Sequence, residues 1–317
     1  MSKANLSETA LHKLFMRFRK HLPRRVKLMI ADLHFKIYGR KMPWSLLRFE
    51  VHLTDKCNLN CAGCIHFSPL CKGINLLDIN TYENDCQRIS ELTSGKIADI
   101  RLLGGEPLLH PGIKDFLVLT RQYFPEINIS NQTGIIELVT NGILLHEQSD
   151  DFWTTCKNNN IRIVISDYPI TIKEKLVKEN AMKFNVELRM YKEKIQSKAT
   201  GSANQWAKIP IDTTGLHDNR KSFGKCFLAG NCFQLVNGKI FKCARIAYID
   251  YFNTTFNKQL KIDENDYIDI YKTKNVDEIL FLLTKPASFC RYCSAGDISW
   301  NNKWEVSKKT IDEYIIK

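Results

Sequence analysis

The chain has 317 residues, 44% of them hydrophobic, and a formal net charge of +12. This length and composition exclude a disordered or fibrous protein and predict one large domain, or a large and a small one. From Met1 to Lys41, eleven Lys and Arg stand against two Asp and Glu, a net charge of +9, which leaves +3 for the remaining chain. Because the positive charge does not follow a groove and no recognition motif is present, no nucleic-acid partner is expected.

Residues 1–45 are predicted to form a basic helical extension that Pro23 interrupts. Apolar residues recur in it at helical spacing, namely Leu11, Leu14, Phe15 and Phe18. Such a segment fits two roles, peripheral contact with an anionic membrane or packing across the body of the protein. No apolar run approaches the ~20 residues of a spanning helix and no secretory signal is present, so a cytoplasmic location is expected, peripheral at the membrane if the extension binds lipid.

From residue 46, short β-rich runs alternate with helical patterns, which is typical of parallel βα units. The active site of such a fold lies at the carboxyl ends of the strands. A core domain is expected at 46–200 and a linker or active-site loop at 201–225. Strands are predicted at 47–53, 98–103, 135–140, 161–166 and 186–191, and helices at about 79–93, 113–123, 144–158 and 171–183.

Residues 226–317 are expected to form a second, smaller unit. Phe233–Val236 and Lys239–Lys242 flank Asn237-Gly238, the signal for a β-hairpin with a type I′ turn. Residues 276–283 are predicted to be helical.

The eleven cysteines are an odd number, which in a cytoplasmic chain argues against disulfides and for metal or redox chemistry. Cys57, Cys61 and Cys64 follow the first predicted strand within eight residues. Three thiolates on one loop suit a 4Fe-4S cluster with one iron open to an outside ligand. A zinc site completed by His52, His66 or a distant cysteine is the alternative.

The Cys-x3-Cys-x2-Cys loop resembles the signature of the radical S-adenosylmethionine (radical SAM) superfamily, and Gly104-Gly105-Glu106-Pro107 resembles its GGEP motif. Weaker matches close the third and fourth strands. The resemblance implies an α/β fold, a partial (β/α)6 TIM-type barrel, with a SAM-binding cluster on the three cysteines. It also implies cofactor contacts from Gly104, Gly105, Glu106, Pro107, Asn141, Ser166 and Asp167. Gly63 stands where many members have an aromatic residue, so adenine packing would fall to a residue such as Phe67.

A second set of cysteines resembles the twitch unit, a shortened SPASM domain built from a β-hairpin and a helix. This resemblance implies an auxiliary 4Fe-4S cluster held by Cys226, Cys243, Cys290 and Cys293. Cys232 could replace Cys226, although it lies too close to Gly238 for the pattern. A structural zinc site is again the alternative.

The resemblance implies reductive cleavage of S-adenosylmethionine to a 5′-deoxyadenosyl radical, which abstracts hydrogen from a substrate. The electron would come from a reductant such as flavodoxin or ferredoxin. Since the architecture most resembles aminocyclitol dehydrogenases and members associated with polysaccharide assembly, we expect an oxidoreductase that oxidises or epimerises a sugar, cyclitol or carrier-linked saccharide. An epimerase would need a hydrogen donor, for which Cys71 and Cys232 are candidates. The alternatives are a radical SAM peptide-modifying maturase and a zinc-stabilised nucleic-acid-binding protein.

Overall fold

Five parallel strands joined by helical crossovers build the first half of the molecule, which confirms the predicted α/β fold. The computed structural model describes residues 23–41, 46–125, 133–166, 168–191, 205–295 and 299–315. Each strand pairs in parallel with its neighbour, in the order β5-β4-β3-β2-β1. Their bounds are Leu47–His52 for β1, Ile97–Leu103 for β2, Ile135–Thr140 for β3, Ile161–Ser166 for β4 and Leu188–Tyr191 for β5.

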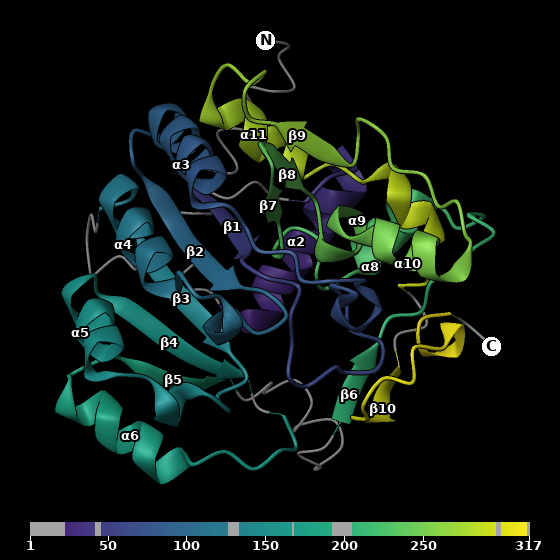
Figure 1. The fold of residues 1–317 in the computed structure, drawn as a ribbon. Helices are drawn as coiled ribbons and strands as arrows, with labels where there is room; N and C mark the ends of the chain where they lie inside the picture. Colours follow the sequence, from purple (N-terminus) through teal and green to yellow (C-terminus); the bar gives the residue numbers. More distant parts are fainter. Residues whose placement is uncertain are drawn as a thin grey trace.

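Four helices run along one side of this sheet (Figure 1). They are α3 Ile79–Thr93, α4 Ile113–Tyr123, α5 Asp150–Asn158 and α6 Glu174–Lys183. Their apolar faces and the outward side chains of the strands form one buried cluster, in which Phe49, Phe116 and Trp153 are almost completely buried. The opposite face of the sheet, which carries polar side chains, is therefore left for the site.

In two of these four helices, α3 and α5, a side chain caps the N-terminus. The Asp78 carboxylate accepts from Thr81 N at 2.8 Å at the start of α3, and the Ser149 hydroxyl accepts from Phe152 N at 3.3 Å at the start of α5. The cap at Ser149 explains why the helix predicted at 144–158 is split into a short 3-10 turn, Leu145–Glu147, and α5.

The sheet continues beyond β1 into the predicted hairpin. β7 (Gln234–Val236) pairs in parallel with β1, and β8 (Lys239–Phe241) and β9 (Tyr267–Asp269) follow in antiparallel pairing. Asn237 and Gly238 have φ of 47° and 75°, as the type I′ turn requires. The sixth parallel strand in the described residues thus comes from the hairpin.

Residues 201–225, expected as a linker or loop, contain regular structure in their described part. β6 (Gln205–Lys208) pairs with β10 (Ser299–Lys303), and α8 (Asn219–Lys225) follows an Asp218 cap. The remaining helices are α9 Ala244–Ala247, α10 Ile249–Phe256 and α11 Val276–Leu283, the last with the bounds predicted. A second buried cluster joins the C-terminal part to the first cysteine loop; it includes Phe67, Leu70, Phe252, Phe289 and Tyr314.

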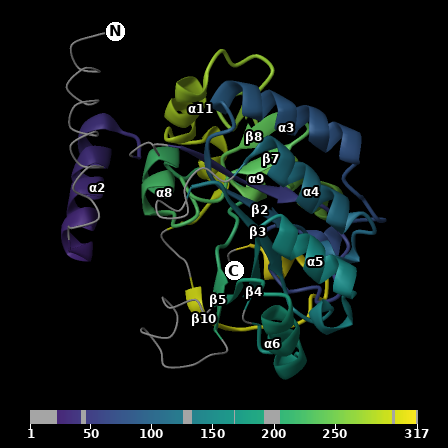
Figure 2. The same ribbon diagram turned by 90° about the vertical axis from the view of Figure 1, so that its left-hand side faces the viewer.

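The described part of the N-terminal extension is α2 (Arg24–Tyr38), which stands at one edge of the molecule beside α8 (Figure 2). The rings of Phe35 and Phe223 lie 6.3 Å apart, so α2 packs on the C-terminal part of the chain. The predicted apolar positions Leu11, Leu14, Phe15 and Phe18 lie outside the described residues. Among the residues described, no helix is both long and apolar enough to cross a membrane.

Candidate functional site

The loop after β1 carries Cys57, Cys61 and Cys64 in a tight backbone path. Gly63 has a φ of 68°, and Cys64 N donates to Cys61 O at 3.3 Å. The left-handed backbone at Gly63 favours glycine, which explains why the family's aromatic residue is absent here. Phe67 is fully buried against Phe252 and Tyr314, so it faces no open cavity for adenine.

The three thiols of this loop lie within electrostatic reach of one another. Burial, together with negative charge at Cys64 and Cys57, raises the pKa of the Cys61 thiol to about 12, against the lowering effect of a hydrogen bond from Trp304. Burial likewise raises the pKa of the Cys57 and Cys64 thiols. The chemistry of three thiols on one loop suits an iron–sulfur cluster, because iron binding would replace their protons and compensate the charge.

The C-terminal segment covers this loop from outside. The indole Nε1 of Trp304 donates to Cys61 Sγ at 3.1 Å. The backbone adds two hydrogen bonds, from Ala62 N to Glu305 O at 2.9 Å and from Ser307 N to Asn60 O at 2.7 Å. No motif in the sequence marks Trp304 as a neighbour of this loop.

The glycine pair after β2 packs against the cysteine loop. A Cβ at Gly105 would lie 2.4 Å from Lys56 O, and one at Gly104 would lie 2.7 Å from Thr54 O. Gly105 N donates to Thr54 O at 2.6 Å. These glycines therefore allow the β1 and β2 loops to touch, a role in addition to the cofactor contact that the motif implies.

Glu106, only 1% exposed, ties the β2 loop to the end of β3. Its carboxylate accepts from the Thr140 hydroxyl at 2.6 Å and from Asn141 N at 2.8 Å. Burial raises its pKa to about 7. Pro107 begins the adjoining 3-10 turn, Pro107–Leu109. Both residues have evident structural roles; their predicted contact with S-adenosylmethionine stays a prediction.

Asn141 and Ser166 line one cavity of about 320 Å³ beyond the ends of β3 and β4, within the size range of small-molecule sites. Asn141 also donates to the Asn58 side chain, next to Cys57, at 2.7 Å. Asp167 lies outside the described residues. Tyr168, which sequence reasoning missed, lines the cavity; burial raises its pKa, and negative charge at all three loop cysteines raises it further.

The second cysteine set surrounds one apolar cavity. Its lining includes Cys226, Cys243, Cys290 and Cys293 but not Cys232. Burial raises the pKa of Cys243 and Cys290, and that of Cys293 to about 11. Among the described residues, neither cysteine set brings three Cys, His, Asp or Glu side chains into a group that could already hold a metal ion. The fit of a cluster at either set therefore rests on the chemistry of its thiols.

A buried polar cluster lies between the first cysteine loop and the hairpin. Asp55 Oδ1 lies 2.9 Å from His52 Nε2, and Asp55 Oδ2 accepts from the Tyr251 hydroxyl at 2.5 Å. Desolvation opposes ionisation of Asp55, but its bonds to His52 and Tyr251 lower its pKa to about 2. Two neighbours keep a buried polar atom without a hydrogen-bond partner among the described residues, namely His52 Nδ1 and the Tyr248 hydroxyl. His66 interacts with the Gln234 side chain.

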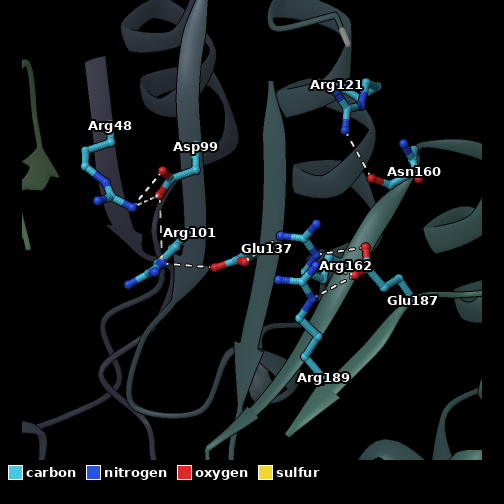
Figure 3. A network of polar contacts seen from close by, with 9 residues as sticks. All are labelled: Arg48, Asp99, Arg101, Arg121, Glu137, Asn160, Arg162, Glu187 and Arg189. Carbon is cyan, nitrogen blue, oxygen red and sulfur yellow. Dashed lines mark hydrogen bonds and ion pairs between the residues drawn. The ribbon is translucent and has the colours of Figure 1, made fainter. Parts of the chain in front are cut away.

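A ladder of ion pairs crosses the polar face of the sheet (Figure 3). Arg48 pairs with Asp99 at 2.7 Å, Arg101 with Glu137 at 3.0 Å, and Arg162 with Glu137 at 3.1 Å. Glu187 extends the ladder because it forms ion pairs with both Arg162 and Arg189. Opposite charges on adjacent strands balance one another, so this face is polar without a large net field.

Comparison with known proteins places residues 47–207 in the family described as "4Fe-4S single cluster domain". Among curated relatives, the GTP 3',8-cyclase of Clostridium perfringens is 36% identical over 111 residues, 35% of this chain and 31% of the relative. That of Geobacter sulfurreducens is 34% identical over 119 residues, 36% of this chain and 31% of the relative. The chain thus spans about a third of the length of these relatives.

Two solved structures show distant likeness. BtrN in complex with AdoMet and 2-DOIA is 18% identical with a TM-score of 0.46, covering 86% of this chain and 98% of that one. Streptococcus suis SuiB bound to precursor peptide SuiA is 10% identical with a TM-score of 0.36, covering 69% and 63%. Since the family match spans half of the chain and contains both the three-cysteine loop and the glycine motif, the chain belongs to the 4Fe-4S single cluster domain family of the radical SAM superfamily.

Proposed function

We propose that this protein is a radical SAM oxidoreductase that acts on a hydroxylated small molecule, namely a sugar, a cyclitol or a carrier-linked saccharide. The observation that carries the proposal is the link between the three-cysteine loop and the cavity of Asn141 and Ser166. Asn141 donates to Asn58, next to Cys57, and Tyr168 in the cavity lining lies within electrostatic reach of all three cysteines. Cys57, Cys61 and Cys64 would hold a 4Fe-4S cluster that, when reduced, cleaves bound S-adenosylmethionine. Asn141 and Ser166 offer polar groups for its ribose hydroxyls.

The buried polar cluster supports a hydroxylated substrate. His52, His66 and Tyr248 lie with ring centroids 4.7 to 5.6 Å apart. His52 Nδ1 and the Tyr248 hydroxyl have no hydrogen-bond partner in the part of the chain that the structure describes. Unpaired buried polar atoms cost free energy unless water or a ligand satisfies them. Hydroxyl groups both donate and accept, and the aromatic faces suit the C–H face of a ring.

The second cysteine set supports oxidation. Loss of a hydrogen atom from a substrate carbinol carbon leaves a carbon radical; loss of the hydroxyl proton and one electron then gives a ketone. An auxiliary cluster on Cys226, Cys243, Cys290 and Cys293 would accept that electron. Epimerisation would instead need a hydrogen-atom donor, and Cys71 Sγ lies 3.3 Å from Asp55 Oδ2 at the edge of the polar cluster.

The test is anaerobic incubation of reconstituted protein with dithionite and S-adenosylmethionine, following 5′-deoxyadenosine. We expect slow formation that cyclitols, sugars or nucleotide-linked saccharides accelerate, and none with the Cys57→Ala, Cys61→Ala, Cys64→Ala triple variant. Cleavage accelerated only by peptides would replace the saccharide assignment with a peptide-modifying one. Zinc without iron in the purified protein would contradict the proposal.

In D2O, an epimerase returns deuterium to the substrate carbon, whereas a dehydrogenase gives a product two hydrogens lighter. We expect a product two hydrogens lighter than the substrate, measured by mass spectrometry.

A further inference from the structure

Arg245 is a buried arginine with two guanidinium nitrogens that have no acceptor among the described residues. It lies in α9, two residues after Cys243, and is 3% exposed. Its Nε and Nη1 have no hydrogen-bond partner among the residues described. Removing a cation from water without pairing it is strongly unfavourable, so folded proteins rarely leave one in this state. This arrangement indicates an anionic group that the guanidinium is built to meet.

The missing anion fits the neighbouring cavity. Arg245 lines it together with Cys226, Cys243, Cys290 and Cys293. The two lysines near this set are already bonded: Lys242 Nζ reaches Pro286 O at 3.5 Å, and Lys41 Nζ donates to Cys226 O at 2.8 Å. In the described lining of this cavity, Arg245 contributes two donors, Nε and Nη1, that remain to be satisfied.

Arg245 also faces the first cysteine loop. Its guanidinium carbon lies 6.0 Å from the ring centroid of Phe67, three residues after Cys64. Its positive charge lowers the pKa of the Cys293 thiol against the raising effect of burial. The guanidinium thus stands between the two cysteine sets, with its unpaired donors in the lining of the second.

We infer that Arg245 donates hydrogen bonds and supplies positive charge to an anionic tetrathiolate iron–sulfur cluster in this cavity, and that it thereby raises the reduction potential of that cluster. The inference rests on the auxiliary cluster of the proposed function. Hydrogen bonds to cluster sulfur and local net charge are two of the factors that set such potentials. A higher potential favours acceptance of the substrate electron.

The experiment isolates the auxiliary cluster in the Cys57→Ala, Cys61→Ala, Cys64→Ala background of the full chain. In that background, Arg245→Met removes the charge at similar length and Arg245→Lys keeps it. Arg291→Met is the matched control, because Arg291 also neighbours Cys290 but bonds to Lys261 O and the Tyr292 hydroxyl. Iron, sulfide and zinc are counted, and the midpoint potential is measured by EPR-monitored redox titration.

We expect Arg245→Met to lower the midpoint potential, Arg245→Lys to restore most of it and Arg291→Met to leave it unchanged. If Arg245→Met fails to assemble a cluster, retention of iron by Arg245→Lys supports the inference, and loss from both overturns it. Equal potentials for Arg245→Met and Arg291→Met also overturn it. Zinc, or no metal, in the triple-alanine background would overturn both this inference and the auxiliary cluster. Formation of 5′-deoxyadenosine by the wild type would still support the first cluster and the cleavage of S-adenosylmethionine.

Discussion

The indole Nε1 of Trp304 donates to Cys61 Sγ at 3.1 Å, across 243 residues of sequence. This bond connects the C-terminal segment to a thiol of the proposed SAM-binding cluster. Hydrogen bonds to a charged acceptor contribute about 1.5 to 3 kcal/mol, so the indole would stabilise the cysteine as a thiolate ligand.

Trp304→Phe removes this donor and keeps the aromatic packing. We expect it to retain iron but to lower the midpoint potential of the first cluster and slow 5′-deoxyadenosine formation with a weak reductant. The control is Glu305→Gln, which preserves the backbone carbonyl that accepts from Ala62 N. Equal potentials for Trp304→Phe and Glu305→Gln would contradict a role for the indole.

Glu106 predicts a pH dependence of stability. Burial raises its pKa from 4.5 to about 7, so the folded protein holds this proton more tightly than the unfolded chain. The resulting stabilisation is fully present below pH 4.5 and is lost as the pH rises through about 7. Relative to Glu106→Gln, the free energy of unfolding of the wild type should fall by about 2 to 3 kcal/mol between pH 5 and pH 8.

The measurement is anaerobic urea unfolding of both proteins at several pH values. Parallel pH profiles would show that Glu106 ionises as readily in the folded as in the unfolded chain.

The cavity of the second cysteine set makes a prediction about Cys232. Because Cys232 is absent from the lining that contains Cys226, Cys232→Ala should keep about eight irons per chain and Cys226→Ala should fall toward about four. Iron and sulfide analysis after anaerobic reconstitution shows whether Cys226 or Cys232 is the ligand. The opposite result would assign Cys232 as the ligand.

An exposed apolar row on α2 leads us to propose that the basic extension contacts a membrane, one of the two roles expected for it, in addition to its packing on α8. Met29, Leu33 and Ile37 lie one turn apart and are 71%, 57% and 60% exposed. The helix packs on α8 through the Phe35 ring. The exposed row would then contact anionic lipid while α8 connects the helix to the rest of the enzyme.

The double variant Leu33→Gln, Ile37→Gln should sediment several-fold less with phosphatidylserine vesicles than the wild type. Leu216→Gln is the matched control, since Leu216 is 85% exposed but lies outside the extension. Equal sedimentation of all three proteins would remove the membrane proposal.

The strands could be predicted because apolar runs and turn signals are local. The bounds of β3 and β4 coincide with the prediction, as do those of α11. The cysteine spacing likewise singled out the four thiols of the second set, and the structure places all four in the lining of one cavity. Their role as cluster ligands stays a prediction.

The unpredicted features depend on contacts between distant segments. Neither the bond from Trp304 to Cys61 nor the unpaired guanidinium of Arg245 has a local sequence signal. Tyr168 and the ion-pair ladder did have one: Tyr168 follows a predicted strand end, and charged residues alternate with apolar ones along β1 and β2.

Glu137 is the centre of that ladder, because it pairs with Arg101 on β2 and Arg162 on β4. Its side chain is 12% exposed. Glu137→Gln leaves both guanidinium groups short of a charged acceptor on the polar face of the sheet. Since Arg101 keeps Glu50 and Arg162 keeps Glu187, we expect a loss of about 2 kcal/mol of unfolding free energy rather than the full cost of an orphaned buried charge.

The control is Glu179→Gln, which breaks the solvent-exposed pair with Lys175 at 3.9 Å and should change stability little. Anaerobic urea unfolding compares the two variants, and equal stability would mean that the ladder is held by packing of the sheet rather than by its charges.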